Sequence, residues 1–250
     1  HRKELKDDQA PHEPALAEQL LRHKMPQWLV ESCVSDKFKA CRAECGDSSV
    51  PAAELADAAI ALISIFDLIK GMGIAKSDMM GNADVLKRQA EAHPGASVQE
   101  LIKKELEQAD LKKLLSGHKF KDAPLDDKGK NVQNVCVSML WLQRALIFIC
   151  VLLETLQTEP KLKTAVDAGY AASLKQHHGF VVKGVFATAS NAAPSKEKFV
   201  GLLADEEEAA MSAITEMLPV VKEILNILGP FMKEIGAETG NYPPGYLCAA

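Results

Sequence analysis

Asp78 and Asn82 lie four positions apart in the stretch AKSDMMGN, inside a region that otherwise predicts helix. Residues at positions i and i+4 project from the same face of a helix. A carboxylate accepts several hydrogen bonds, whereas an amide both donates and accepts them. The two residues alone leave two interpretations open. One is an acid favoured by a helix N-terminus beside a surface amide, and the other is a pair that binds a polyhydroxylated ligand such as a sugar.

Trp141 lies in the apolar run SMLWLQRALIFIC. The main apolar stripe of this run passes through Met139, Leu142 and Leu146, so Trp141 points about 100° away from it on a helix. The default interpretation is a core aromatic residue. The alternative is a flat indole that stacks on the apolar face of a sugar ring. Arg144, one turn further on, is a candidate ion-pair partner for an acid.

His177 and His178 precede the apolar segment GFVVKGVF. On a helix, adjacent residues point in different directions, so the two histidines do not predict a paired metal site. One is expected at the surface, and the other is a candidate hydrogen-bond donor to a carbonyl. Neither has a nucleophile or acid partner at a recognisable spacing. Phosphate-loop, GxGxxG, GxSxG and HExxH motifs are also missing from the sequence. We therefore expect no enzyme, no catalytic residue, no metal and no cofactor.

The composition is that of an ordinary globular protein, with 250 residues of which 47% are hydrophobic and 25% charged. The formal net charge is −5 and the pI is near 5.8, which argues against a nucleic-acid partner. Six cysteines show neither a CxxC pair nor zinc-site spacing. No signal peptide is recognised, so we expect a reducing, cytoplasmic setting.

The elements that would position these side chains are all predicted to be helices. The strongest prediction covers 131–157, where a 3/4 alternation of apolar residues marks one buried stripe. The nine residues 145–153 are apolar on every face, too few for a membrane span of ~20 residues, so this helix is expected at the centre of the core. A second long helix is expected after Ser49 as N-cap and a third from Ser77 or Asp78. Further helical regions are 166–194 and 206–235. Strand-like alternation is absent, so the predicted class is all-α.

Taken together, AKSDMMGN, MLWLQRALIFICVLLETL and LKQHHGFVVKGVFATASNAAPSKEKFVGLL resemble the glycolipid transfer protein family. The first resembles its D-x-x-x-N headgroup motif, the second its tryptophan helix and the third its histidine segment. Clear similarity covers residues 55–90 and 130–203. The resemblance implies an all-α, two-layer helical sandwich of about eight helices. Residues 49–236 would form the lipid-binding domain, 1–48 a partly helical N-terminal extension without an assigned role, and 237–250 a C-terminal tail.

The resemblance also implies roles for the four headgroup residues. Asp78 would accept hydrogen bonds from the ceramide amide and the sugar, and Asn82 would bond the sugar hydroxyls. Trp141 would stack on the first sugar ring, and His178 would donate to the ceramide amide carbonyl. The family further places Val137 and Phe186 along the pocket for the hydrocarbon chains.

Two positions depart from the family pattern. The lysine that the family carries three residues after the Asn is Val85 here, and Lys87 lies two positions further along. The aromatic residue after HHG, usually a tryptophan that anchors the protein at a membrane interface, is Phe180. We expect Phe180 to be the membrane-docking residue, with weaker docking than a tryptophan would provide.

The expected function is to bind a single glycosphingolipid, such as galactosylceramide or glucosylceramide, and to transfer it between membranes. The protein would act as a cytoplasmic monomer, peripheral to membranes, with transient membrane contact and no nucleic-acid partner. The first alternative is ceramide-1-phosphate transfer, because Arg144 could bind a phosphate, although Asn82 and Trp141 favour a sugar. The others are a sphingolipid sensor that does not transfer its lipid and an enzyme using Asp78 and His178.

Overall fold

The computed structural model describes residues 27–248, and within them the chain is all-α. The described helices in chain order are α2 (Trp28–Ser32), α3 (Val34–Ala43), α4 (Ala52–Ile63), the 3-10 helix η1 (Ser64–Leu68), α5 (Gly73–Ala92), α6 (Val98–Gln108), α7 (Leu111–Leu115), α8 (Val135–Thr158), α9 (Leu162–Ala172), the 3-10 helix η2 (Leu174–Gln176), α10 (Phe180–Asn191), α11 (Lys196–Leu203) and α12 (Glu207–Glu234). The prediction of an all-α fold is confirmed. The helices outnumber the expected eight because one-turn helices such as α2 and α7 are too short to show a periodic pattern.

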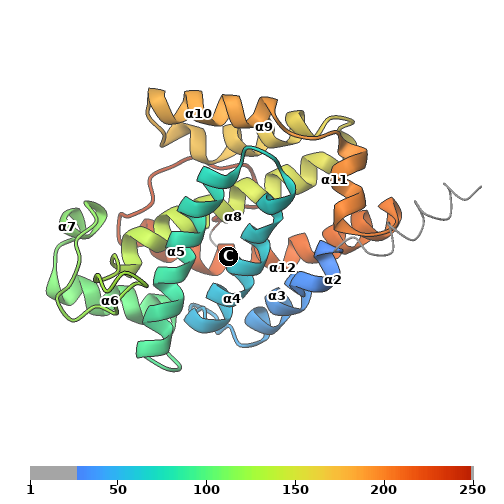
Figure 1. Ribbon diagram of the computed structural model, residues 1–250. Helices are drawn as coiled ribbons and strands as arrows, with labels where there is room; N and C mark the ends of the chain where they lie inside the picture. The colour runs from blue at the N-terminus through green and yellow to red at the C-terminus, as the bar shows by residue number, and fades with distance from the viewer. Residues whose placement is uncertain (1–26, 249–250) are drawn as a thin grey trace, which may run out of the picture.

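The long helices form two packed layers (Figure 1). Helices α3, α4 and α5 make one layer, and α9, α8 and α12 make the other. The layers meet where α5 and α4 pack on α8 and where α12 packs on α3. Helix α10 lies on α9, and α6 and α7 lie at the opposite end of the molecule from α11 (Figure 1). Helix α8 is therefore the central element, touching both layers.

The central position of α8 follows from its composition. Within residues 27–248 it is the one helix long and apolar enough to cross a membrane, and 89% of its most apolar 18-residue window is buried inside the protein. The helix begins at Val135 rather than at 131, because Asn134 is its N-cap and accepts a 2.9 Å hydrogen bond from the Val137 amide. The buried Glu105 carboxylate also accepts hydrogen bonds from the amides of Val135 and Cys136. The prediction of a buried core helix here is confirmed.

Helices α4 and α5 begin at different residues from those predicted. Helix α4 starts at Ala52 with Pro51 as its N-cap, so the prediction of a Ser49 cap was wrong. Pro51 has an extended backbone and forms an isolated β-bridge with Ser97, so the helix cannot begin before Ala52. After η1 the chain reverses at Gly71, whose φ of +92° is in the left-handed region. Helix α5 then begins at Gly73, which places Asp78 in its second turn rather than at its N-terminus.

The histidine segment is a turn between helices rather than part of one long helix. The predicted helical region 166–194 is interrupted after Ala172, where η2 and a turn precede α10. His177 closes η2, His178 lies in the turn, and Gly179 is the N-cap of α10. Because the chain turns between α9 and α10, the His178 ring lies next to Trp141 of α8.

Both ends of the described chain pack on the helical core. Val34, Phe38 and Cys41 of α3 are fully buried against it, and the Trp28 indole donates a 2.7 Å hydrogen bond to Ser64. Residues 1–26 lie outside the described range, as do 249 and 250. The domain limits at 48/49 and 236/237 remain predictions.

Candidate functional site

A cavity of about 440 Å³ opens between α5, α8 and α10, and we refer to it as the main cavity. Its volume is in the ~300–1,000 Å³ range of small-molecule sites. Its lining residues are Ile74, Ala75, Asp78, Met79, Asn82, Gln133, Trp141, Ala145, Leu174, His178, Val182, Val185 and Phe186. Five of the seven predicted site residues are therefore brought together here: Asp78, Asn82, Trp141, His178 and Phe186.

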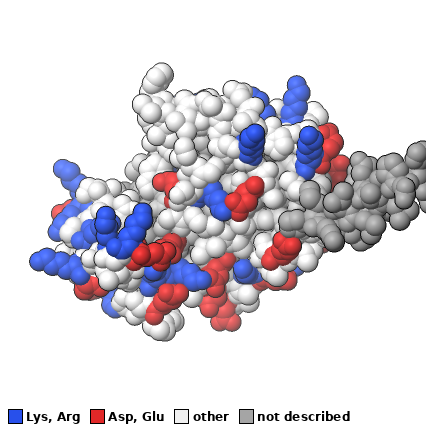
Figure 2. All heavy atoms as spheres, viewed as in Figure 1, with Lys and Arg blue, Asp and Glu red and all other residues white. Residues whose placement is uncertain are grey.

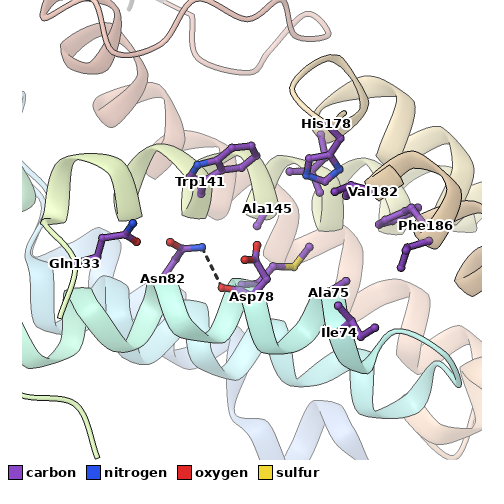
Figure 3. Close-up of a pocket in the computed structure, with 13 residues that line it drawn as sticks. Ile74, Ala75, Asp78, Asn82, Gln133, Trp141, Ala145, His178, Val182 and Phe186 are labelled. Atoms are coloured by element: carbon purple, nitrogen blue, oxygen red, sulfur yellow. Dashed lines mark hydrogen bonds between the residues drawn. The ribbon is translucent and has the colours of Figure 1, made fainter. Parts of the chain in front are cut away.

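The main cavity is polar at one end and apolar at the other. Figure 3 shows Gln133, Asn82 and Trp141 at one end, with Asp78 facing the space between α5 and α8. At the other end the labelled lining residues are Ile74 and Phe186, and Val182 lies beside them. An occupant with a hydrogen-bonding head and a hydrocarbon body would match this division.

The α5 side of the polar end offers hydrogen-bonding groups that the protein does not use fully. The Asn82 side-chain amide donates a 3.0 Å hydrogen bond to the backbone oxygen of Asp78, which leaves its carbonyl oxygen available. The Asp78 carboxylate makes no hydrogen bond or ion pair with another residue in the range 27–248, and its side chain is exposed. A ligand that brings hydroxyl or N–H donors would satisfy these acceptors.

On the α8 side, the Trp141 indole is half-buried and contacts two neighbours. The His178 imidazole stacks on it with a centroid distance of 5.7 Å and an interplanar angle of 25°. The Arg144 guanidinium carbon lies 5.1 Å from the indole centroid, within the range of a cation–π contact. The indole is therefore fixed in orientation before any ligand arrives.

Arg144 does not face the main cavity, because its charge is paired inside the protein. Its Nε and Nη2 atoms donate to the two carboxylate oxygens of Glu238 at 2.9 and 3.0 Å. Arg144 is 5% exposed and Glu238 is 4% exposed. Burial alone would raise the pKa of Glu238, but hydrogen bonds from Arg144, the Gly240 amide and the Tyr242 hydroxyl hold that pKa below its ordinary value.

His178 is oriented by a second aromatic residue. Its Nδ1 lies 3.1 Å from the Tyr170 hydroxyl oxygen. Burial lowers the pKa of His178, an effect that the Asp78 charge partly opposes, so the imidazole is neutral near pH 7. A neutral imidazole whose Nδ1 accepts from the Tyr170 hydroxyl carries its proton on Nε2, the form that donates a hydrogen bond to a carbonyl.

The two predicted chain-pocket residues lie in different places. The Phe186 ring stacks on Tyr170 at 3.7 Å between centroids and lines the main cavity, with Phe148 edge-on behind it at 5.4 Å. Val137 is buried in the first turn of α8 and is not among the lining residues of that cavity. The apolar end is therefore built on Phe186.

An exposed apolar surface that includes Phe180 lies at the edge of the main cavity. It is 92% exposed, the most of any large hydrophobic side chain described. Its exposed neighbours are Ile74, Val181, Val182 and Val185, and we name these five residues the apolar rim. Three of them, Ile74, Val182 and Val185, also line the cavity. Figure 2 shows charged side chains crowded over α4 to α7 and few over the α10 end of the same face.

Three residues that shape the site were missed by sequence reasoning. Gln133 lies in an extended segment before α8, Tyr170 lies on α9, and Glu238 lies in the tail 94 positions after Arg144. None of them belongs to a local pattern, because each meets its partner through the packing of separate elements.

The family model described as Glycolipid transfer protein matches residues 50–205. Among curated proteins, the Homo sapiens pleckstrin homology domain-containing family A member 8 is 38% identical over 112 residues, which cover 41% of this chain and 22% of that protein. Among solved structures, the fungal glycolipid transfer protein HET-C2 is 26% identical with a TM-score of 0.62, over 75% of this chain and 87% of that one.

A second solved structure has the same fold and holds a phosphate lipid. The human ceramide-1-phosphate transfer protein, in complex with ceramide-1-phosphate, has a TM-score of 0.68 over 88% of this chain and 100% of that one. Its sequence identity of 20% shows the fold alone. Proteins named for a glycolipid and for a phosphate lipid share this architecture, so the fold alone does not determine the headgroup.

Proposed function

The chain belongs to the glycolipid transfer protein family, whose members are non-enzymatic lipid transfer proteins, and we propose that it carries one glycosphingolipid such as galactosylceramide or glucosylceramide between membranes. The observation that supports this proposal is the division of the main cavity into a polar and an apolar end. The sugar would occupy the polar end, and the ceramide chains would enter the apolar end. Each CH₂ group removed from water there contributes roughly 0.8 kcal/mol.

The polar end supplies one contact for each part of the headgroup. In this proposal the Trp141 indole stacks on the first sugar ring, and Asp78 and Asn82 bond its hydroxyls. Asp78 also accepts from the ceramide amide N–H, while His178 donates to the amide carbonyl. An amide left without a partner in such a site would cost ~1–3 kcal/mol, which is how the cavity would select a ceramide lipid.

The charges around the main cavity favour a sugar over a phosphate. A phosphate site needs fixed cations, and among the described residues no Lys or Arg lines this cavity. Arg144, the cation nearest the indole, is occupied by the Glu238 carboxylate. The carboxylate of Asp78 would in addition repel a phosphate.

The apolar rim supports transient docking on a membrane. Phe180 and Val181 are exposed beside the cavity, so a bilayer that covers them would also cover the route by which hydrocarbon chains enter. Helix α8 is buried and would not insert. We therefore propose a protein that is peripheral to membranes, works on the cytoplasmic side and needs no second copy to complete its site.

A vesicle transfer assay tests the proposal. Donor vesicles would carry fluorescent galactosylceramide or, separately, fluorescent ceramide-1-phosphate, and the protein would be wild type, Asp78→Val or Trp141→Ala. We expect galactosylceramide transfer that both substitutions reduce at least about tenfold, since each removes a contact of 1–3 kcal/mol. Glu91→Val, on the same helix but outside the cavity, is the control and should transfer normally.

The other outcomes would contradict parts of the proposal. Transfer of the phosphate lipid alone would overturn the sugar assignment and leave the fold. Binding of galactosylceramide without transfer would make the protein a sensor. Absence of binding to either lipid would refute the proposed function.

A further inference from the structure

A cavity of about 820 Å³ lies between the loop after α3, the first turns of α6 and the second half of α12, and we name it the α12 cavity. None of the described residues lines both this cavity and the main cavity. Figure 1 shows α3 and α6 in the lower half of the molecule and α10 at the top. The α12 cavity is therefore separate from the lipid site, and the proposed function gives it no role.

A buried amide lines the α12 cavity without using its donors. Gln99 is 3% exposed, and its Oε1 accepts a 3.0 Å hydrogen bond from the Val50 amide. Its Nε2 has no hydrogen-bond partner among residues 27–248. Buried donors are nearly always paired in folded proteins, because an unpaired one loses its hydrogen bonds with water. A ligand that brings a carboxylate or carbonyl oxygen would satisfy this donor.

The charged groups at the α12 cavity include both signs. The Lys103 ammonium makes no ion pair among the described residues and lies 5.8 Å from the centroid of the Phe231 ring. The Asp47 and Glu234 carboxylates also make no ion pair there. Ile227 and Phe231 supply apolar surface to the same cavity. A short peptide, which carries carboxylates, carbonyl groups and an ammonium group, would match these side chains.

Cys45 places a thiol at this cavity. It follows the C-cap of α3 and is half-buried, and its Sγ lies 3.2 Å from the Cys41 backbone oxygen, which orients the sulfur. A hydrogen bond from the buried Cys41 thiol lowers the pKa of Cys45; burial opposes this effect, the Arg42 charge adds to it, and Glu54 of α4 opposes it. Because the thiolate is the form that attacks a disulfide, Cys45 combines reactivity with an adjacent binding cavity.

We infer that Cys45 is a site of reversible mixed-disulfide formation with a small peptide thiol, which the α12 cavity binds through Gln99 and Lys103. The Cys45 thiolate attacks one sulfur of the peptide disulfide. A new S–S bond joins that sulfur to Cys45, the original S–S bond breaks, and the second peptide leaves as a thiolate. The peptide disulfide is the oxidant, and an excess of the peptide thiol reverses the step.

The experiment compares two disulfides that react with the reduced 250-residue chain. Glutathione disulfide carries tripeptides with carboxylates and ammonium groups, whereas cystamine has ammonium groups but neither carboxylates nor peptide bonds. Mass spectrometry of peptides, after alkylation of the remaining thiols, measures the rate of modification at each cysteine. Cys33 and Cys248 are the internal controls, because both are exposed and neither lines the α12 cavity.

With glutathione disulfide we expect Cys45 to react about tenfold faster than either exposed cysteine, because it is more readily deprotonated and its cavity binds the peptide. Dithiothreitol should remove the adduct. The opposite order would be expected if exposure alone set the rate.

Two variants test recognition of the peptide. Lys103→Met should lower the rate at Cys45 about fivefold with glutathione disulfide, because a charge-assisted contact to a carboxylate is lost, and should not lower it with cystamine. Lys104→Met is the matched control on α6, outside the α12 cavity, and should change neither rate. Gln99→Glu keeps an acceptor for the Val50 amide but removes the free donor, so it should show the same selectivity as Lys103→Met.

Several outcomes would overturn the inference. Modification of Cys33 or Cys248 as fast as that of Cys45 would refute a dedicated site. Equal losses with both disulfides in Lys103→Met would refute recognition of a peptide. An internal disulfide between Cys41 and Cys45, formed in place of the adduct, would refute the mixed disulfide. Each of these results leaves the proposed lipid function intact, since the two cavities share no residue among those described.

Discussion

The polar end of the main cavity and the apolar rim beside the cavity hold their side chains in different ways. At the polar end Trp141 contacts Arg144 and His178, and each of these has its own partner, Glu238 and Tyr170. At the apolar rim the side chains of Phe180 and Val181 are exposed.

This difference matches two separate tasks. Recognition of a headgroup needs donors and acceptors that are already oriented, because every side chain ordered on binding reduces affinity. Docking on a fluid membrane needs only apolar area that can adapt. Substitutions at the polar end and at the apolar rim should therefore affect different quantities.

The largest effect is expected where the polar end is anchored. Replacing Glu238 with Ala leaves the Arg144 charge buried and unpaired, which should lower the free energy of unfolding by ~3–5 kcal/mol. Urea denaturation followed by circular dichroism measures this. The matched control is Glu223→Ala, which breaks the exposed Arg42–Glu223 pair and should cost less than ~1 kcal/mol. Equal losses in the two variants would show that the buried pair does not anchor the site.

The second effect concerns the rim alone. Phe180→Ser should lower the rate of transfer about tenfold, because burial of a Phe side chain in a membrane interface contributes ~1.5–3 kcal/mol. Binding of galactosylceramide dispersed without vesicles should change less than twofold, since Phe180 does not line the cavity. Vesicle flotation and transfer assays separate the two quantities. A parallel loss of binding would mean that rim and cavity are not independent.

A smaller effect in the opposite direction is expected for Phe180→Trp. The indole has a larger apolar surface and an N–H group suited to the membrane interface. Membrane association should rise by roughly twofold to fivefold, with headgroup selectivity unchanged. Flotation on phosphatidylcholine vesicles measures the first quantity, and competition between galactosylceramide and ceramide-1-phosphate measures the second. A change in selectivity would show that the rim also affects headgroup recognition.

The smallest effect is a pH dependence at the polar end. Burial lowers the pKa of His178 in the folded protein below that of the unfolded chain. The unfolded chain therefore binds the proton more readily, and stability should be lost as pH falls below about 6.5. His178→Gln should flatten the profile of unfolding free energy between pH 7 and pH 5. An unchanged slope would assign the pH dependence to other groups, such as His177, whose pKa is also lowered by burial.

Sequence patterns located much of this site because helix periodicity is local. Asp78 and Asn82 were predicted to share one face of a helix, and both line the main cavity. Trp141 was predicted to point away from the apolar stripe of its helix, and the structure places it half-buried at the cavity. The roles of these residues in binding remain predictions.

Other parts were not visible in the sequence. The sequence predicted one helix for the histidine segment, because its residues are compatible with helix. In the structure η2 packs on α8, and Gln176 and His177 bond to the tail at Asn241 and Tyr242. Val137 was expected along the chain pocket; it is buried in α8 and does not line the main cavity, and its role stays a prediction. The pairing of Arg144 with Glu238 joins residues far apart in the chain, and no local pattern predicts such a contact.

The sequence by itself determined the all-α class, the central place of the apolar helix and the faces that carry Asp78, Asn82 and Trp141. These features depend on the 3.6-residue period and on burial of apolar stripes. The tertiary structure decided which faces meet. It placed Gln133 beside Asn82, and it paired Arg144 with Glu238. Packing of distant elements settles such contacts, because the free energy of a buried charge depends on every neighbour that surrounds it.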